Sequence, residues 1–325
     1  MEYVKLGNTG LDVSRLCLGC MGFGVSGTWK LAPWVLDEEQ SFPIIKKALE
    51  LGINFFDTAN VYSLGSSEEV LGKALKKYAK RDEVVLATKV FNQMHEGPNG
   101  QGLSRKAIMS EIDKSLKRLD TDYVDLYIIH RWDYNTPIEE TMEALHDVVK
   151  AGKARYIGAS SMFAWQFQKA LHVAETNGWT RFVSMQNHYN LMYREEEREM
   201  LPSCKEEKIA LTPYSPLASG RLVRDWSVTT NRTETDKIAV TKYGATIDVD
   251  RPIYDRVVEL AEKKGLSKTQ IALGWMLQKS TAPIVGATKI SHIEDAVSAL
   301  PVTLTDDEVA YLEEPYIPHK IVGHV

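Results

Sequence analysis

Short apolar runs alternate along the chain with longer segments in which apolar residues recur at the period of an α-helix. The runs lie at residues 16–20, 54–56, 84–87, 124–129, 154–158, 182–185, 209–212 and 283–285. Amphipathic segments between them include 104–119, 138–150, 165–175 and 195–206. Strands that alternate with helices are typical of parallel βαβ units. Eight such strand-like runs predict a closed (β/α)8 barrel, the TIM-barrel fold.

The regular alternation is preceded by a short hairpin pattern and interrupted by two long polar or turn-rich segments. Residues 3–6 and 11–13, separated by a turn that starts at Gly7 and ends at Gly10, predict an N-terminal β-hairpin. Segments 22–36 and 222–251 are too long for simple connections and are expected to be long loops at the C-terminal face. Because no internal repeat or low-complexity linker divides the chain, we expect a single domain over residues 1–325.

Composition narrows the class of protein. The 325 residues carry a net charge of −5, with 44% hydrophobic and 26% charged residues, which is typical of a globular protein. The absence of a strong basic block argues against nucleic acid and anionic membranes as partners. Neither an apolar leader nor a run of about 18 apolar residues is evident. We therefore expect a cytoplasmic protein.

The cysteines and the first glycine-rich segment carry little chemical signal. Cys17 and Cys20 fit a C-x-x-C pattern, but on a strand they point to opposite faces, and no second cluster completes a metal site. They are predicted to be buried structural thiols. Residues 19–24 read G-x-x-G-x-G, which differs from the dinucleotide fingerprint, and no helical segment follows at once.

The ends of three consecutive strand-like runs carry polar residues. The second run ends in Asp57, the third in Lys89 and the fourth in His130, and Tyr62 follows Asp57 in a loop. In a parallel barrel these ends meet at one rim, where barrel enzymes carry their catalytic residues. Each residue alone has a structural interpretation, as a cap, a surface lysine, a polar strand end or a loop phenol. The four together predict an active site.

This combination suits proton delivery to a carbonyl group. A free phenol titrates near pH ~10, and a neighbouring ammonium from Lys89 would lower the pKa of Tyr62. Asp57 would hold Lys89, and His130 would donate a hydrogen bond to the carbonyl oxygen. Tyr62 would act as general acid in reduction and as general base in oxidation. No side chain supplies the hydride that such a reaction needs.

Several motifs of the chain resemble those of the aldo-keto reductases. They are FDTA at 56–59 with VY at 61–62, ATK at 87–89, IH at 129–130, YIGASS at 156–161, MQNHYN at 185–190 and YSPL at 214–217. The resemblance, which is to a bacterial-type branch related to channel β subunits, covers nearly the whole chain. It implies a (β/α)8 barrel that binds a nicotinamide dinucleotide without a Rossmann domain, and thus a hydride donor.

The resemblance also implies cofactor-binding residues. Ser160, Ser161 and Gln186 match positions that bind the nicotinamide carboxamide, although many members have Asn in place of Ser161. Tyr214 matches the aromatic residue that stacks on the nicotinamide ring. The pyrophosphate would lie near Ser215 and Leu217, and the adenosine end near Gly286, Thr288, Lys289, His292 and Asp295.

The choice between dinucleotides depends on the last of these segments. Lys289 precedes a predicted helix N-terminus, where phosphates bind, and favours NADP(H) through the 2′-phosphate. His292 stands where many members have Arg or Gln, so NAD(H) remains the alternative. Phe23, Trp29 and Trp132 are expected to line an apolar mouth around the substrate, with packing at the barrel top as the structural alternative.

The sequence therefore predicts an NADPH-dependent reductase of aldehydes or ketones, reversible as an alcohol dehydrogenase, with a small-molecule carbonyl substrate. One alternative is a nicotinamide-binding regulatory subunit with slow turnover. Another is an enzyme of sugar-phosphate metabolism. A third is a Schiff-base enzyme that uses Lys89, which leaves the cofactor residues unexplained. The loops 22–36, 91–103 and 222–251 contain no motif that identifies the substrate, and no pattern specifies the oligomeric state.

Overall fold

The computed structural model describes residues 1–29, 32–228 and 235–324. Both long segments expected to form loops are therefore described only in part. Residues 30–31 of the first and 229–234 of the second lie outside the described residues.

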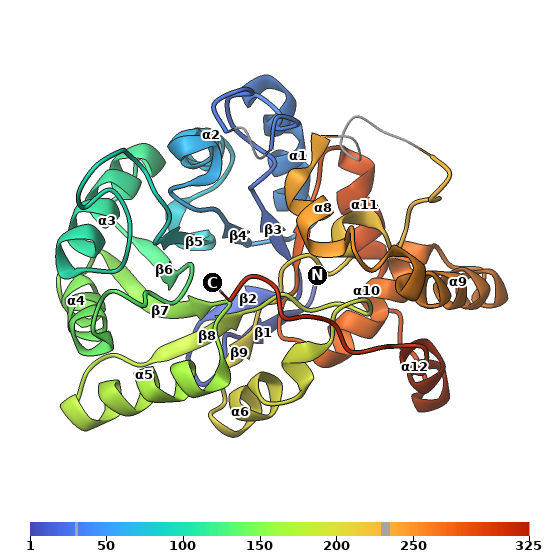
Figure 1. Ribbon diagram of the computed structural model, residues 1–325. Coiled ribbons are helices and arrows are strands. Elements are labelled where there is room, and N and C mark those ends of the chain that lie inside the picture. Colours follow the sequence, from blue (N-terminus) through green and yellow to red (C-terminus); the bar gives the residue numbers. More distant parts are fainter. Residues whose placement is uncertain (30–31, 229–234, 325) are drawn as a thin grey trace.

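Eight parallel strands form the predicted barrel (Figure 1). Around the sheet the order is β10-β3-β4-β5-β6-β7-β8-β9, so that neighbours in sequence are neighbours in space. The last gap is closed by a bridge between Tyr214 and Ile284, where the Ile284 amide donates to the Pro213 carbonyl at 2.8 Å. The strands are β3 (Cys17–Gly19), β4 (Phe55–Asp57), β5 (Val85–Val90), β6 (Val124–Ile129), β7 (Ala154–Ser160), β8 (Phe182–Gln186), β9 (Ala210–Leu211) and β10 (Ile284–Gly286).

Helices surround the strands on the outside of the barrel (Figure 1). They are α1 (Glu38–Glu50), α2 (Ser66–Tyr78), α3 (Arg105–Leu119), α4 (Ile138–Lys150), α5 (Ala164–Asn177), α6 (Met200–Glu206), α10 (Lys268–Lys279) and α11 (Ile290–Ser298). Local chemistry sets several of their starts. Ser104 accepts a hydrogen bond from the Ala107 amide, and Ser267 forms a capping box with Gln270.

The segment 222–251 is only partly a loop, so its prediction was wrong in part. It contains the helix α8 (Lys237–Tyr243) and the first turns of α9 (Ile247–Lys264). The residues before Pro252 are mostly polar, so the sequence gives no helical apolar pattern there. The apolar residues through which α9 is buried come later in the helix. Ile253, Val257 and Leu260 pack in a core cluster that also contains residues of α10 and of α12 (Asp306–Glu313).

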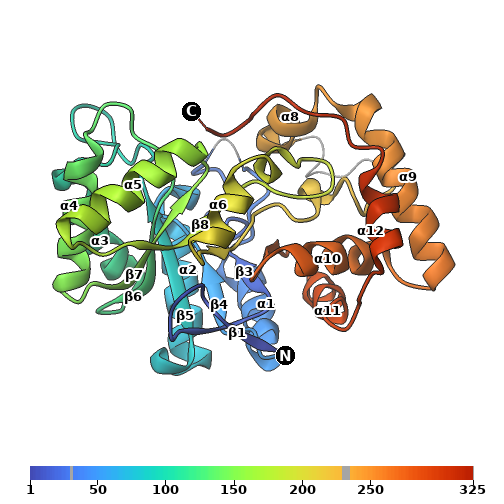
Figure 2. The ribbon, with the colours of Figure 1, turned by 90° about the horizontal axis from the view of Figure 1, so that it is seen from below.

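The N-terminal hairpin closes one end of the barrel. Its strands β1 (Tyr3–Lys5) and β2 (Asp12–Ser14) pair antiparallel, as predicted. Leu6 and Val13 belong to the cluster that fills the barrel interior. Cys17 belongs to the same cluster, whereas Cys20 lies in the core between strands and helices, so the two thiols occupy opposite faces of the sheet, both buried. Figure 2 shows the two chain ends on opposite sides of the molecule.

The region between α12 and residue 324 runs across the opposite, C-terminal face of the barrel (Figure 1). Its contacts include a hydrogen bond from the Val322 amide to the Tyr193 hydroxyl at 3.2 Å. His319 pairs with Asp250 at 2.9 Å, and His324 pairs with Glu196 at 3.0 Å. No group suited to a metal ion occurs among the described residues, and none of their helices has the length and apolarity to cross a membrane.

Gly7 provides a test of how the hairpin closes the barrel. Its φ is +60°, and a Cβ there would lie 2.7–2.8 Å from backbone atoms of Val183, Ala210 and Lys208. We expect Gly7→Ala to lower the free energy of unfolding by about 1–3 kcal/mol, because of left-handed strain and overpacking. Urea unfolding would measure the change. Gly10→Ala in the same turn is the control, since its Cβ meets nothing within 4 Å. Equal effects of the two substitutions would contradict this account.

Candidate active site

Three of the four predicted catalytic residues form one hydrogen-bonded group at the C-terminal rim. Lys89, near the end of β5, lies 2.5 Å from Asp57 Oδ2 at the end of β4 and 3.2 Å from the Tyr62 hydroxyl. Tyr62 begins the 3-10 helix η1 (Tyr62–Gly65) directly after the β4 loop. The Lys89 side chain has 0% exposed surface and that of Asp57 4%. The register of neighbouring parallel strands thus places an ammonium beside both a carboxylate and a phenol.

The ammonium of Lys89 is fully satisfied inside the protein. Besides Asp57 and Tyr62 it donates to the Thr58 carbonyl at 2.7 Å, which uses all the donors of the group. Burial by itself would lower the pKa of Lys89, but Asp57 and Tyr62 outweigh it, and the pKa is raised. Lys89 therefore stays charged at neutral pH.

The balance at Tyr62 differs from the prediction. Burial raises the pKa of the Tyr62 phenol, and the positive charge of Lys89 only partly opposes it. Lys89 lowers the pKa as predicted, but the net shift is upward, because the loss of solvent outweighs one neighbouring ammonium. The phenol is protonated at neutral pH and ready to donate.

His130 lies against Tyr62 with its ring edge-on, at 5.7 Å between ring centres. The Asn92 side-chain amide lies 3.0 Å from His130 Nδ1. Since that amide nitrogen can only donate, Nδ1 accepts and the proton is on Nε2. Burial lowers the pKa of His130 well below its ordinary value, and the charges of Arg131, Lys89 and Lys242 add to the effect. The ring is therefore neutral and offers one N–H donor.

The residues expected around the nicotinamide lie at the ends of β7, β8 and β9. Ser160 and Ser161 are buried at the end of β7, and the Ser161 hydroxyl donates to the Tyr214 hydroxyl at 3.3 Å. Gln186 ends β8, and its side-chain nitrogen donates to Asp57 Oδ1 at 2.9 Å. The predicted carboxamide site is thus in direct contact with the carboxylate of Asp57.

Tyr214 belongs to an aromatic stack. The His188 ring lies parallel to the Tyr214 ring, at 5.4 Å between ring centres. It also lies parallel to the Tyr193 ring, at 4.3 Å between ring centres. Lys242 of α8 places its ammonium 4.1 Å from the centre of the Tyr214 ring. Burial would raise the pKa of Tyr214, but Lys242, Arg131 and the Ser161 hydrogen bond together lower it. The ring therefore lies in a region of positive potential.

The remaining cofactor positions line the loops after β9 and β10. Ser215 has φ +55°, and its carbonyl accepts from the Asn190 side chain at 3.0 Å; Leu217 precedes the 3-10 helix η4 (Ala218–Gly220). Gly286 ends β10, and Thr288 and Lys289 follow it, with Lys289 exposed directly before α11. The Thr288 amide donates to His292 Nδ1 at 3.4 Å, and Asp295 accepts from the Ser267 hydroxyl at 2.8 Å.

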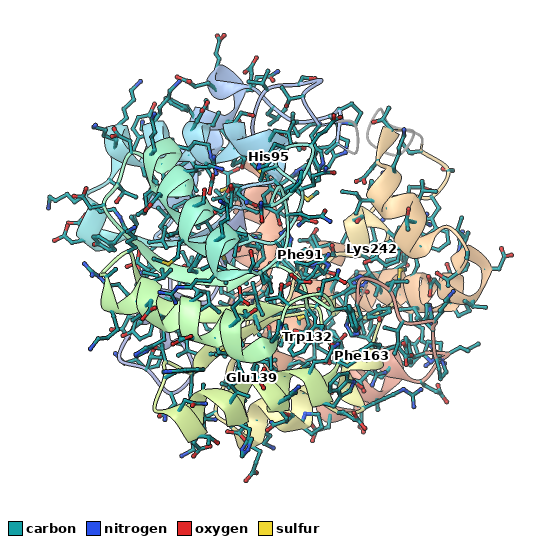
Figure 3. The ribbon with its side chains drawn as sticks, turned by 60° about the vertical axis from the view of Figure 1, so that its left-hand side comes forward. Phe91, His95, Trp132, Glu139, Phe163 and Lys242 are labelled. Atoms are coloured by element: carbon teal, nitrogen blue, oxygen red, sulfur yellow. The ribbon has the colours of Figure 1, made fainter. Side chains whose placement is uncertain are left out.

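The expected substrate residues do not all lie in the site. Trp29 lies 5.9 Å from Tyr62 between ring centres, and Trp132 lies 6.1 Å from Trp165. Phe23 is fully buried, and both Phe23 and Trp132 belong to the core cluster between strands and helices. Figure 3 shows four labelled side chains around the middle of the view, those of Phe91, Trp132, Phe163 and Lys242.

Asn92 and Lys242 are site residues that the sequence analysis missed. Asn92 lies just after the end of β5, three residues after Lys89. This position at a strand end is the signal that could have identified it. Lys242 gave no such signal, because its helix was assigned to a loop.

Two surface cavities lie apart from this group. One of about 320 Å³ is lined by ion-paired residues that include Arg194 and Glu313, and one of about 720 Å³ by residues that include Tyr189 and Gln278. Neither is lined by any of the four predicted catalytic residues. The chemistry is therefore concentrated at the barrel rim.

Comparison with known proteins agrees with this geometry. The sequence pattern of the aldo/keto reductase family matches residues 15–317. The chain belongs to the aldo/keto reductase family.

Relatives of this aldo/keto reductase match it over nearly its full length. Versiconal hemiacetal acetate reductase of Aspergillus parasiticus is 48% identical, over 99% of this chain and 98% of the relative. Aldo-keto reductase dtxS3 of Metarhizium robertsii is 45% identical, over 100% and 93%. A protein provisionally named an aryl-alcohol dehydrogenase in Schizosaccharomyces pombe is 43% identical, over 99% and 98%. These relatives are fungal, whereas the sequence pointed to a bacterial-type branch. The family and the named relatives support carbonyl reduction by an oxidoreductase.

The buried pair of this aldo/keto reductase can be tested through stability alone. Lys89→Met leaves Asp57 buried without its cation, so we expect the free energy of unfolding in urea to fall by about 3–5 kcal/mol. The double variant Asp57→Asn with Lys89→Met should recover part of this loss. Lys80→Met, which removes the exposed Lys80–Glu83 pair, should leave stability nearly unchanged, because solvent screens such a pair. If Lys89→Met behaved like this control, the pair would not be the buried interaction described.

Proposed function

We propose that the protein is an NADPH-dependent oxidoreductase that reduces aldehydes or ketones to alcohols, reversibly. The observation that carries this proposal is the hydrogen bond between Lys89 and Tyr62, with Asp57 as the second partner of the ammonium. It joins a protonated phenol to a fixed positive charge that can stabilise the phenolate once the proton has left.

Each of the four residues has a role at a stated atom. The Tyr62 hydroxyl donates a proton to the substrate carbonyl oxygen in reduction, and the phenolate takes it back in oxidation. Lys89 stabilises the phenolate, and Asp57 keeps Lys89 charged. His130, neutral with its proton on Nε2, donates a hydrogen bond that orients the carbonyl. NADPH supplies the hydride when it is bound.

The chain's residues fit a nicotinamide group. Gln186 uses its nitrogen for Asp57, which leaves its side-chain oxygen free to accept from a carboxamide. Ser160 and Ser161 bring hydroxyl groups to the same place, and Tyr214 offers an aromatic face. That face has the Lys242 ammonium over it, so the flexible lysine side chain would move when a nicotinamide ring stacks there.

The preference for NADP(H) rests on the loop after β10. Lys289 is exposed at the start of α11, where a phosphate would meet both the ammonium and the helix N-terminus. Gly286 has nothing within 4 Å of where a Cβ would stand, so the backbone there is open to a close approach. The imidazole of His292 already accepts a hydrogen bond from the Thr288 amide. Because a neutral imidazole is a poorer partner for a 2′-phosphate than arginine, NAD(H) is the alternative cofactor.

The competing functions fare differently against this geometry. A Schiff-base lysine must be deprotonated to attack a carbonyl, yet Asp57 and Tyr62 overcome burial and raise the pKa of Lys89. The Schiff-base alternative is therefore disfavoured. A regulatory subunit would keep the nucleotide site but turn over slowly, and an enzyme of sugar-phosphate metabolism would keep the same catalytic residues. Turnover measurements separate these possibilities.

The proposal predicts tight cofactor binding and turnover on a simple carbonyl. Fluorescence titration with NADPH and separately with NADH, followed by 4-nitrobenzaldehyde, should show tighter NADPH binding and loss of the nicotinamide absorbance. Tyr62→Phe should bind NADPH normally but lose about 10²–10⁴-fold in reduction rate. Unchanged turnover in this variant would remove Tyr62 from the mechanism. Tight binding without turnover would favour the regulatory alternative, and absence of binding would contradict the proposal.

The pKa directions predict the pH profile of reduction. The phenol is the active form of Tyr62, and burial raises its pKa, so this form persists through neutral pH and is lost only at alkaline pH. The low pKa of His130 keeps its ring neutral above the acid range. At saturating substrates, kcat should stay level through neutral pH and fall only in the alkaline range, above the ordinary phenol pKa of ~10. Cofactor affinity measured at each pH is the control. A break near pH ~6.5 would show that His130 titrates with an ordinary pKa.

A further inference from the structure

The imidazole of His130 is held by the side chain of Asn92, and the two residues come from neighbouring strand ends. Val90 of β5 pairs with Ile129 of β6, and the His130 amide donates to the Val90 carbonyl at 2.9 Å. Asn92 is the second residue after Val90, which is the last residue of β5. The strand register therefore places His130 beside the segment of chain that carries Asn92.

The backbone directly before Asn92 has an unusual conformation. Phe91 has φ +155°, which a bulky residue rarely adopts. A hydrogen bond from the Gly102 amide to the Phe91 carbonyl at 2.7 Å holds this turn. Strained residues of this kind persist only where surrounding contacts fix them, and they cluster at functional sites. Here the strained residue sets the direction from which the Asn92 side chain reaches the imidazole.

The hydrogen bond between the two side chains has the opposite polarity from the one that often orients an imidazole. The usual partner of Nδ1 is an acceptor, whereas Nδ2 of Asn92, at 3.0 Å from Nδ1 of His130, can only donate. A proton on Nδ1 would set two N–H groups against each other, so the other neutral tautomer and the imidazolium both lose this hydrogen bond. Among the described residues none accepts a hydrogen bond from Nε2, so the Nε2 donor remains for a ligand.

The charges around the ring do not choose between its tautomers. Burial lowers the pKa of His130, and the positive charges of Arg131, Lys89 and Lys242 lower it further. Tyr62, which meets the ring edge-on at 5.7 Å between ring centres, is itself protonated. These surroundings keep the imidazole neutral, but both neutral tautomers carry the same charge. The choice between them therefore depends on the hydrogen bond at Nδ1.

We propose that Asn92 is a positioning residue of this reductase: its side-chain amide fixes the Nε2–H tautomer of His130 and so preserves the donor that orients the substrate carbonyl. The inference rests on the proposed function and adds a residue to its mechanism. The role requires no contact of Asn92 with substrate or cofactor, because it acts through His130. With the other tautomer, a lone pair on Nε2 would face the carbonyl oxygen and repel it.

The tautomer can be measured without turnover. Long-range proton–nitrogen correlation spectra of the protein with isotope-labelled histidine distinguish the protonated from the unprotonated nitrogen of each ring, and His130→Gln identifies the signals of His130. We expect the proton on Nε2 in the wild-type protein at neutral pH, and a mixture of tautomers in Asn92→Leu. A proton on Nδ1 in the wild type, or an unchanged spectrum in Asn92→Leu, would overturn the inference whatever the protein catalyses.

Asn92→Asp replaces the donor by an acceptor of the same size. A carboxylate beside Nδ1 favours the imidazolium and raises the pKa of His130; above that pKa the remaining proton stays on Nδ1, and Nε2 no longer donates. Reduction of 4-nitrobenzaldehyde by NADPH should therefore fall roughly 10²-fold as the pH rises through this pKa, whereas the wild-type kcat stays level. Gln93→Glu, which places the same charge at the adjacent exposed position, should keep the level profile.

A double-mutant cycle separates positioning from a purely structural role. Asn92→Leu should lower kcat/KM by about three- to tenfold in the wild-type background, which corresponds to the loss of one hydrogen bond. In the His130→Gln background it should have no further effect, because the group through which Asn92 acts is already gone. Equal losses in both backgrounds would overturn the inference.

The outcomes also distinguish this inference from the proposed function. If the wild-type protein reduces the aldehyde and Asn92→Asp keeps a level pH profile, the role of Asn92 is overturned while the reductase stands. If the wild-type protein does not reduce the aldehyde, the proposed function fails and the positioning role fails with it. A wild-type proton on Nε2, together with a profile that falls in Asn92→Asp but not in Gln93→Glu, supports the role of Asn92.

Discussion

A lysine ammonium with no exposed surface, held by Asp57, is the interaction on which the site depends. Burying a charge is costly unless a partner of opposite charge and further hydrogen bonds compensate it. The barrel meets this requirement through strand register: β4 and β5 are neighbours, so Asp57 and Lys89 reach the same rim. The Thr58 carbonyl and the Tyr62 hydroxyl complete the ammonium's shell. Every catalytic role proposed for Tyr62 derives from this arrangement, because a persistent positive charge in contact with the hydroxyl stabilises a buried phenolate.

The same burial explains why the phenol and the imidazole respond differently to their surroundings. Loss of solvent disfavours the charged form of either group, which raises the pKa of Tyr62 and lowers that of His130. Both groups are therefore neutral hydrogen-bond donors at neutral pH. One of them can give up its proton because Lys89 is in contact with it, whereas the other has only positive charges around it. The proposed division between Tyr62 as proton donor and His130 as orienting donor rests on this difference between their neighbours.

Much of the fold could be predicted from the sequence, because the alternation of apolar runs and amphipathic segments is a local signal. The strands ending at Asp57, Lys89 and His130 were placed within a residue or two of where they end. The failures have identifiable physical causes. The start of α9 is polar and precedes a proline, so a local pattern could not show the apolar face that tertiary packing buries. The sign of the Tyr62 pKa shift depends on how much solvent is lost, which no sequence spacing reports. Phe23 looked like a residue of the mouth because its loop leads there, yet its ring packs inside the core.

Strands β9 and β10 are the two ends of the sheet, and the place where they meet also carries a proposed cofactor residue. β9 spans only Ala210–Leu211, and the circle is completed farther along by backbone bonds around Pro213, Tyr214 and Ile284. The residue proposed to carry the nicotinamide ring is thus part of the seam of the barrel. A bound dinucleotide would stabilise the contact between these two strands. The Ile284 amide should therefore exchange its hydrogen more slowly as more of the site is occupied. The barrel of this protein is thus completed at the residue where the nicotinamide ring is proposed to stack.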